Sequence, residues 1–331
     1  MPQRDSLPQT GGGLFLTDGG LETVLIFHDG IDLPGFAAFP LLEDDAGQAA
    51  LRAYYEPFLA LARERGTGFV LTSPTWRANP DWGAKLGYDA ETLAKVNRHS
   101  IELMERLRAD ADADQPILIE GLLGPRDDGY APAATMTARE AEQYHAVQLR
   151  VLADTAADYA SAITITYAEE AIGVVRAAEK AGLPSVIAFT LETDGRLPSG
   201  QSLEDAIDQV DAETDGACAY FMINCAHPTH FADVVAEGGA YRERIRGLRA
   251  NASTRSHAEL DEAEDLDDGD PEDLGARYVA LRDALPNLSV LGGCCGTDIR
   301  HVRAIAAAWQ AAESAANPDR MPSSGGPSGM M

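Results

Sequence analysis

The sequence predicts a single (β/α)8 TIM barrel of the α/β class, and two observations support it. Short apolar runs alternate with alanine-rich helical stretches along most of the 331 residues. This alternation is typical of repeated βα units that share a parallel sheet. Eight such units fit into roughly 300 residues, which is the size of one (β/α)8 barrel. An open, doubly wound sheet is the alternative that the same alternation allows.

The expected strands are short and apolar, and most of them end next to glycine or polar residues. They cover residues 14–18, 68–72, 117–120, 162–165, 185–189, 220–223, 247–251 and 288–291. Helical patterns between them include residues 49–64, 138–159, 169–181 and 300–316. We therefore divide the chain into an N-terminal extension (1–13), a barrel domain (14–316) and a tail (317–331). The tail is rich in Pro, Ser and Gly, and we expect it to be disordered.

Composition excludes several classes of partner. The chain carries 26 basic and 53 acidic residues, a net charge of −27. Nucleic acids and anionic membranes bind basic patches, so neither is expected as a partner. No run of 18 or more apolar residues suggests a membrane span, and the first residues lack the apolar core of a signal peptide. With only four cysteines, we expect a cytoplasmic protein whose clustered cysteines bind metal rather than form disulfides. The sequence is compatible with a homo-oligomer.

Three of the four cysteines lie where expected strands end. Cys225 ends an apolar run, and Cys294 and Cys295 lie together in a Gly-Gly-Cys-Cys-Gly run. Three soft thiolates form a tetrahedral zinc site with its fourth position open, which is typical of a catalytic zinc. The competing interpretations are three buried apolar side chains or a vicinal disulfide. Cys218 has no such neighbour and is interpreted as a structural residue.

The barrel prediction strengthens this metal hypothesis. The ends of parallel strands meet at one face, so Cys225 and the Cys294–Cys295 pair come within reach of one ion. We expect Gly292, Gly293 and Gly296 to give the backbone the freedom to turn both adjacent thiols towards the ion.

Two histidines offer a competing set of ligands. His227 and His230 follow Cys225 closely, and Pro228 makes the segment a loop from which both imidazoles could reach a metal. We expect them to shape the site instead. A histidine in the fourth position would make the zinc structural, as in a non-catalytic zinc-binding protein. A histidine ligand together with a metal-bound water would indicate a zinc-dependent hydrolase.

An acidic segment follows the seventh expected strand. Residues 259–273 contain ten carboxylates in fifteen positions. The ordinary interpretation is a solvated loop and the start of a helix. Its position also places it at the C-terminal face of the barrel, where a negative rim could attract a cationic substrate.

Several motifs resemble one enzyme family. They are the runs at residues 292–297 and 223–225, the opening run at 16–22, the second-strand run at 72–79 and the fifth-strand region at 185–200. Together they are similar to the motifs of the homocysteine S-methyltransferase family over residues 14–310. The resemblance implies a (β/α)8 barrel, a catalytic Zn²⁺ held by the three cysteines, and a place in methionine biosynthesis. The substrates would be a small thiol, homocysteine, and a cationic sulfonium or ammonium methyl donor. Among donors, we favour a sulfonium such as S-methylmethionine, because it is the better leaving group.

The resemblance also suggests substrate contacts. Asp18 matches an aspartate that contacts the substrate's amino group, and a turn residue before two glycines is the alternative interpretation. Glu22 either caps the next helix or faces the pocket. Asn224 is expected to orient the zinc loop more than to touch the substrate. Thr75, with Trp76 and Asn79, is a candidate for the donor pocket, although Trp76 is equally well explained as a packing residue.

One position departs from the family. Many members end the fourth strand in Glu-Thr, and that glutamate helps to hold the amino acid's ammonium group. Here Ile163 takes its place and Thr164 follows it. Thr164, Thr166 and Tyr167 offer hydroxyl groups but no charge. The sequence therefore leaves open an altered recognition of homocysteine or another small thiol as acceptor.

Overall fold

Eight parallel strands close into one barrel in the order of the chain. The structure, a computed structural model, describes residues 2–129, 135–263 and 265–316. The strands are β1 (Phe15–Leu16), β2 (Gly68–Thr72), β3 (Ile117–Leu123), β4 (Tyr159–Ile165), β5 (Ser185–Thr190), β6 (Cys218–Asn224), β7 (Ile245–Ala250) and β8 (Val290–Gly293). Because β1 pairs with both β2 and β8, the sheet has no edge. The predicted (β/α)8 barrel is confirmed, and the open sheet is excluded.

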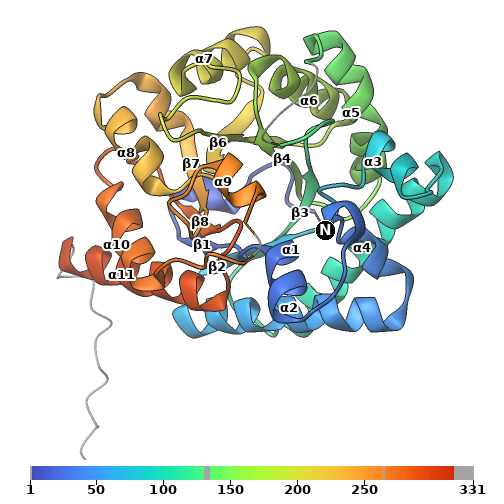
Figure 1. Cartoon of the computed structure of the whole chain (residues 1–331), viewed down its shortest axis with the longest axis horizontal. Helices are drawn as coiled ribbons and strands as arrows, with labels where there is room; N and C mark the ends of the chain where they lie inside the picture. Colours follow the sequence, from blue (N-terminus) through green and yellow to red (C-terminus); the bar gives the residue numbers. More distant parts are fainter. Residues whose placement is uncertain (1, 130–134, 264, 317–331) are drawn as a thin grey trace, which may run out of the picture.

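Helices surround the strands (Figure 1). They are α1 (Leu21–Thr23), α2 (Asp45–Arg65), α3 (Pro80–Lys85), α4 (Ala90–Asp110), α5 (Ala138–Ala153), α6 (Ala168–Ala181), α7 (Leu203–Glu213), α8 (Pro228–Ala236), α9 (His257–Asp261), α10 (Pro271–Ala280) and α11 (Ile299–Ala316). Their boundaries follow local chemistry. Asp44 caps α2 by accepting a hydrogen bond from the Gly47 amide, and the helix ends at Gly66 with φ 65°. The helix predicted over residues 138–159 ends at Ala153, because the chain turns there to enter β4.

Two groups of buried side chains stabilise the barrel. The larger group packs the outward faces of the strands against the helices. The smaller group fills the barrel interior and includes Phe15, Val70, Leu118, Tyr159 and Met222. Successive residues of a strand point to opposite faces, so most strands contribute to both groups.

The N-terminal residues close the bottom of the barrel. Leu7 belongs to the interior group of buried side chains. The fully buried Gln9 donates a hydrogen bond to the Tyr220 hydroxyl, 3.2 Å away. Part of the predicted extension therefore packs as part of the barrel. The predicted disordered tail lies outside the described residues. Within the described residues, we find no helix with the length and apolar character needed to cross a membrane.

The acidic segment lies at the opposite end of the barrel. It contains α9, which follows β7 and lies across the strands in Figure 1. Leu260, Ala263, Asp265, Leu266 and Asp267 line the cavity at this end. The prediction from position is thus correct: this segment forms one wall of the cavity at the C-terminal face.

Candidate metal and substrate site

Cys225 leaves β6 in a backbone conformation that is uncommon for a residue with a side chain. Its φ is +51°. Such a conformation costs about 1–3 kcal/mol, so it persists only where the surroundings hold it. Here the surroundings do so. The Cys225 amide donates to the Arg249 carbonyl at 3.1 Å. The Cys225 carbonyl accepts hydrogen bonds from Asn251 Nδ2 at 3.0 Å and His257 Nε2 at 2.6 Å. These contacts fix the direction of the thiol.

Cys294 and Cys295 follow β8 in a similarly fixed loop. The Cys294 amide donates to the Ala250 carbonyl at 2.8 Å, and the Cys295 carbonyl accepts from the Ala252 amide at 3.1 Å. The neighbouring glycines act differently from one another. Gly296 has φ +77°, as expected for a turn. Gly292 is instead required by close packing, because a Cβ there would lie 1.8 Å from Thr17 Oγ1.

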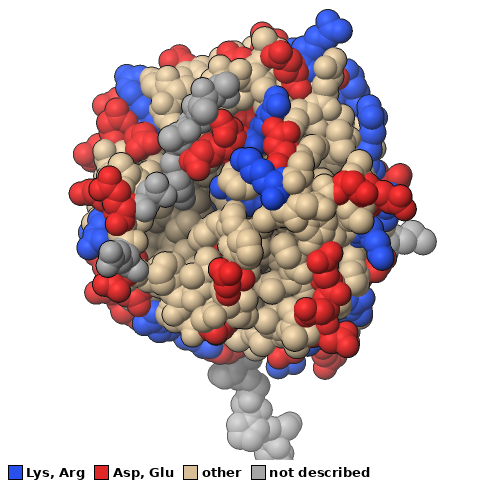
Figure 2. Space-filling model, turned by 45° about the vertical axis from the view of Figure 1, so that its right-hand side comes forward, with Lys and Arg blue, Asp and Glu red and all other residues tan. Residues whose placement is uncertain are grey.

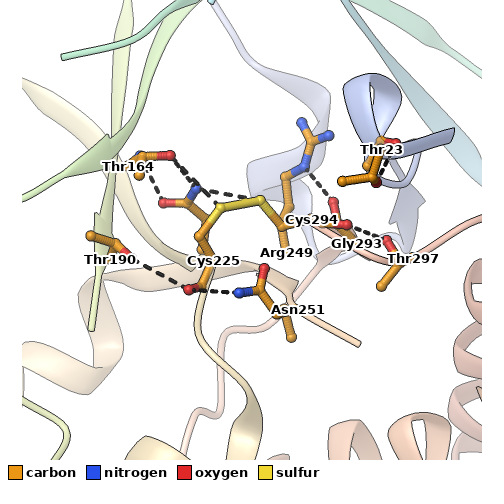
Figure 3. The surroundings of a disulfide bond; sticks show 12 residues. Thr23, Thr164, Thr190, Cys225, Arg249, Asn251, Gly293, Cys294 and Thr297 are labelled. Atoms are coloured by element: carbon orange, nitrogen blue, oxygen red, sulfur yellow. Dashed lines mark hydrogen bonds between the residues drawn. A yellow bond between two sulfur atoms is a disulfide. The ribbon is translucent and has the colours of Figure 1, made fainter. Parts of the chain in front are cut away.

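The three thiols converge at one point. The sulfur atoms of Cys225, Cys294 and Cys295 all lie within 4.8 Å of one another. A disulfide joins Cys225 to Cys294 in this structure (Figure 3), which differs both from the expected free thiols and from the alternative of a vicinal Cys294–Cys295 disulfide. That pair must be reduced before its sulfurs can act as thiolate ligands. Three soft sulfur donors from two strand ends fit a tetrahedral zinc ion with one open position.

An amide side chain orients this group. Asn224 accepts a hydrogen bond from the Thr164 amide at 2.9 Å and donates to Thr164 Oγ1 at 3.0 Å. Its Nδ2 also lies 3.9 Å from Cys294 Sγ. Thr164 has φ +63°, next to an irregularity in the pairing of β4 with β5. Asn224 thus connects the end of β4 to the thiol of Cys294.

The two histidines make other contacts. His227 caps α8, and its Nδ1 lies 2.8 Å from Thr229 Oγ1. His230 Nε2 lies 2.9 Å from the Thr254 carbonyl. Over the described ranges, the cysteines form the only group of three or more His, Cys, Asp or Glu side chains close enough to share a metal. The structure therefore supports a three-thiol site that includes neither histidine.

Asp18 lines the cavity but is already paired. Its Oδ1 accepts from Arg249 Nη2 at 2.6 Å, and its Oδ2 accepts from the Tyr54 hydroxyl at 3.1 Å. Arg249 also donates to the Thr72 hydroxyl and to the Gly293 carbonyl. Burial lowers the pKa of Arg249, but the carboxylates of Asp18 and Glu120 raise it by more. The guanidinium therefore stays charged. Asp18 is therefore held by an internal cation.

Glu22 is the contrasting carboxyl group. It lies in α1, lines the same cavity and is partly exposed. Burial raises the pKa of Glu22 to about 7, with a smaller contribution from the nearby Asp18 charge. Such a group takes up or releases a proton near neutral pH and ionises more readily when a cation binds beside it.

The cavity extends outwards from the thiols. Its volume is about 490 Å³, and Figure 2 shows a hollow with carboxylate side chains at its border. Ile163, Thr164 and Trp76 line it. Ile163 brings no charge to the position where many family members carry glutamate.

Two polar candidates for the donor pocket are not brought to the cavity. Thr75 is fully buried, and its hydroxyl donates to the Leu122 carbonyl at 2.7 Å. Asn79 caps α3 and donates to the Pro125 carbonyl at 3.2 Å. Neither residue lines the cavity. The polar atoms of both side chains are used to fix the loop after β2.

Sequence reasoning missed two arginines of the cavity, Arg249 and Arg77. A signal existed for Arg249. Leu248 and Ala250 face the surrounding helices, so the alternation of side chains along β7 points Arg249 into the barrel. A charged residue that points inwards from a buried strand is rare unless it is paired. Arg77 follows Trp76 in the loop after β2 and has no comparable signal.

Fold and site together define a class. A closed (β/α)8 barrel carries three convergent thiols and a deep cavity at the C-terminal ends of its strands, where barrel enzymes have their active sites. The sequence model of the homocysteine S-methyltransferase family matches residues 15–309. The chain therefore belongs to the homocysteine S-methyltransferase family and is a methyltransferase enzyme.

Solved structures agree on the fold. The homocysteine methyltransferase MmuM from Escherichia coli in its metallated form is 16% identical, with a TM-score of 0.67 over 89% of this chain and 96% of that one. Its oxidized form is 17% identical, with a TM-score of 0.69 over 93% and 99% of the two chains. A search of curated proteins found no match.

Proposed function

We propose that this enzyme is a zinc-dependent S-methyltransferase that moves a methyl group from a sulfonium or ammonium donor to the sulfur of homocysteine, giving methionine. The observation that carries the proposal is the convergence of Cys225, Cys294 and Cys295 at the inner end of the cavity. When bound there, zinc would promote loss of the acceptor's thiol proton and keep its sulfur nucleophilic.

The reaction needs positioning more than acid or base catalysis. A bond forms between the acceptor sulfur and the methyl carbon, while the bond from that carbon to the onium atom breaks and its electron pair leaves with the neutral product. The thiol proton is released to solvent. The residues of the cavity contribute by excluding water and aligning the two substrates.

Recognition of the acceptor depends on the carboxyl groups. The carboxylate of Asp18 already binds Arg249 and Tyr54, and Ile163 has no charge. Glu22 is therefore the residue we assign to the acceptor's ammonium group. Thr164 contributes a hydroxyl at the cavity wall, and Asn224 holds Thr164 beside the thiols.

A second acceptor class follows from the same observation. If Glu22 does not take an ammonium group, neither of the two positions that the family resemblance assigns to it is available: Asp18 is paired with Arg249, and Ile163 has no charge. A small thiol without an ammonium group, such as 3-mercaptopropionate, is then the better substrate.

The direct test is methyl transfer by reduced, zinc-loaded protein. Homocysteine and 3-mercaptopropionate are each incubated with S-methylmethionine, a betaine and a dimethylsulfonio compound, and the methylated products are measured by mass spectrometry. Methionine from one donor, lost in Cys294→Ala and retained in Cys218→Ala, supports the proposal. No methylated product from either thiol, with one zinc bound, contradicts it.

A further inference from the structure

Two tryptophans of the cavity hold a guanidinium between them. The centre of the Arg77 guanidinium lies 4.0 Å from the Trp76 ring centroid and 3.7 Å from that of Trp82. Lys85 Nζ lies 3.8 Å from the Trp82 ring as well. Arg77 is only 6% exposed, and its Nη1 donates to the Asp127 carbonyl at 3.2 Å. Stacking and burial thus fix both the position and the charge of Arg77.

This arrangement changes what the aromatic rings can bind. A sulfonium or ammonium donor would be expected to rest on the faces of tryptophan rings. Here Arg77 already stacks on Trp76 and Trp82, and Lys85 stacks on Trp82 as well. The like charge of Arg77, which lines the cavity, disfavours an onium group at this wall. It favours an anionic group, which a planar guanidinium binds with directed N–H donors.

Most of the other charged side chains that line the cavity are acidic, unlike Arg77. Arg77, Trp76 and Trp82 line the same cavity as the thiols. The other charged groups of its lining are Arg249, which binds Asp18, and the carboxyls of Glu22, Asp128, Asp265 and Asp267. The positive charge of Arg77 also acts on Glu22, whose pKa it lowers in part. The cavity is therefore acidic overall, with a fixed cation at its tryptophan wall.

We propose that Arg77 is the specificity residue that binds the carboxylate of a substrate in this cavity. The ligand is then a zwitterion or an onium carboxylate, whose cationic end lies away from the Trp76–Trp82 wall. The carboxylate can come from the methyl donor or from the thiol acceptor, because both substrates share the cavity. This proposal rests on the methyl-transfer function proposed above.

The test compares matched ligands by calorimetry, which needs no turnover. For the donor, reduced, zinc-loaded protein is titrated with dimethylsulfoniopropionate and with trimethylsulfonium, which lacks the carboxylate. For the acceptor, the pair is homocysteine and 3-aminopropane-1-thiol. Arg77→Gln removes the charge. Lys85→Gln is the control, because Lys85 contacts the same ring without lining the cavity.

The expected result is selective. Arg77→Gln lowers the affinity for the carboxylate-bearing ligand of one pair by about 30-fold or more. This corresponds to the loss of a charge-assisted hydrogen bond of about 2 kcal/mol. Its partner without the carboxylate changes less than about twofold, and Lys85→Gln changes neither. The pair that responds identifies the donor or the acceptor as the source. Equal weakening of all ligands, or of none, overturns the proposal.

Two further measurements distinguish a misfolded variant and a wrong methyl-transfer function from a wrong carboxylate site. If Arg77→Gln loses the native near-ultraviolet circular dichroism, Arg77→Lys replaces it. That variant keeps the charge but not the planar donors, and we expect a smaller, equally selective loss. If no thiol is methylated but the selective loss of binding remains, the methyl-transfer function is wrong while the carboxylate site stands.

Discussion

Two neighbouring groups of side chains in this cavity are held in different ways. In the thiol group, hydrogen bonds to backbone atoms and packed glycines fix Cys225, Cys294 and Cys295. In the carboxylate group, Asp18 follows β1 and is held by Arg249 from β7, 231 residues away. The first group is determined by local structure at strand ends, whereas the second depends on an ion pair across the barrel.

The largest expected effect concerns the thiol group. Cys294→Ala removes one of three ligands, so we expect loss of stoichiometric zinc binding and a fall in methyl transfer of about three orders of magnitude or more. Cys218→Ala is the matched control, since Cys218 is a buried cysteine at the start of β6. Zinc content by mass spectrometry checks the effect, and unchanged zinc binding in Cys294→Ala would contradict the three-thiol site.

The next effect concerns the ion pair. Arg249→Met leaves Asp18 and Glu120 buried without their cation, so we expect a loss of unfolding free energy of about 3–5 kcal/mol. Urea denaturation measures it. Arg303→Met breaks an exposed pair with Glu64 and should leave stability nearly unchanged.

A double variant sharpens this test. Adding Asp18→Asn to Arg249→Met should restore part of the lost stability, because it removes one of the two unpaired charges. Strict additivity of the two losses of unfolding free energy would mean that the ion pair between Arg249 and Asp18 does not stabilise the carboxylate group.

A smaller effect links the thiols to β4. Asn224→Ala removes the hydrogen bonds to Thr164 and the contact with Cys294, so zinc affinity should fall about 10–100-fold while all three ligands remain. Competition with a chelator measures the affinity. Asn287→Ala is the control, because Asn287 is partly exposed and its side chain donates to the Glu243 carbonyl. Equal affinities in the two variants would remove Asn224 from the metal site.

Glu22 should make acceptor binding depend on pH. Its pKa is raised to about 7, so its carboxylate form increases as pH rises from 6 to 8. Homocysteine affinity should rise with it, and Glu22→Gln should lower that affinity about tenfold at pH 8. Calorimetry with 3-mercaptopropionate, which lacks the ammonium group, gives the reference. The same pH profile in Glu22→Gln and the wild type would exclude Glu22 from this role.

The same residue should give the smallest effect, on stability. The folded-state pKa of Glu22, about 7, lies above the ordinary value of a glutamate side chain, 4.5. The folded state therefore holds more protons between these values, and the unfolding free energy falls as pH rises through that window. Glu22→Gln should raise the melting temperature modestly above pH 7 and leave it unchanged below pH 4. A higher melting temperature at low pH only would contradict the assigned direction.

The convergence of the three thiols could be predicted from the sequence, because strand ends can be located from apolar runs and a barrel brings those ends to one face. The neutralisation of Asp18 could not be predicted, because it depends on which side chain lies opposite Asp18 after closure. Arg249 lies within β7, and that strand could be recognised in the sequence only by the apolar residues beside Arg249. The placement of Thr75 could not be predicted either, because a polar residue after a strand can form hydrogen bonds within the loop instead of facing the cavity.

The central claim is that the three thiols form a metal site with one position left for the acceptor's sulfur. X-ray absorption at the zinc edge of reduced, zinc-loaded protein counts sulfur neighbours directly. The account predicts three sulfurs in the resting enzyme and four after addition of homocysteine, with three retained when homoserine is added instead. Three sulfurs with both ligands, or four before any thiol is added, would contradict it.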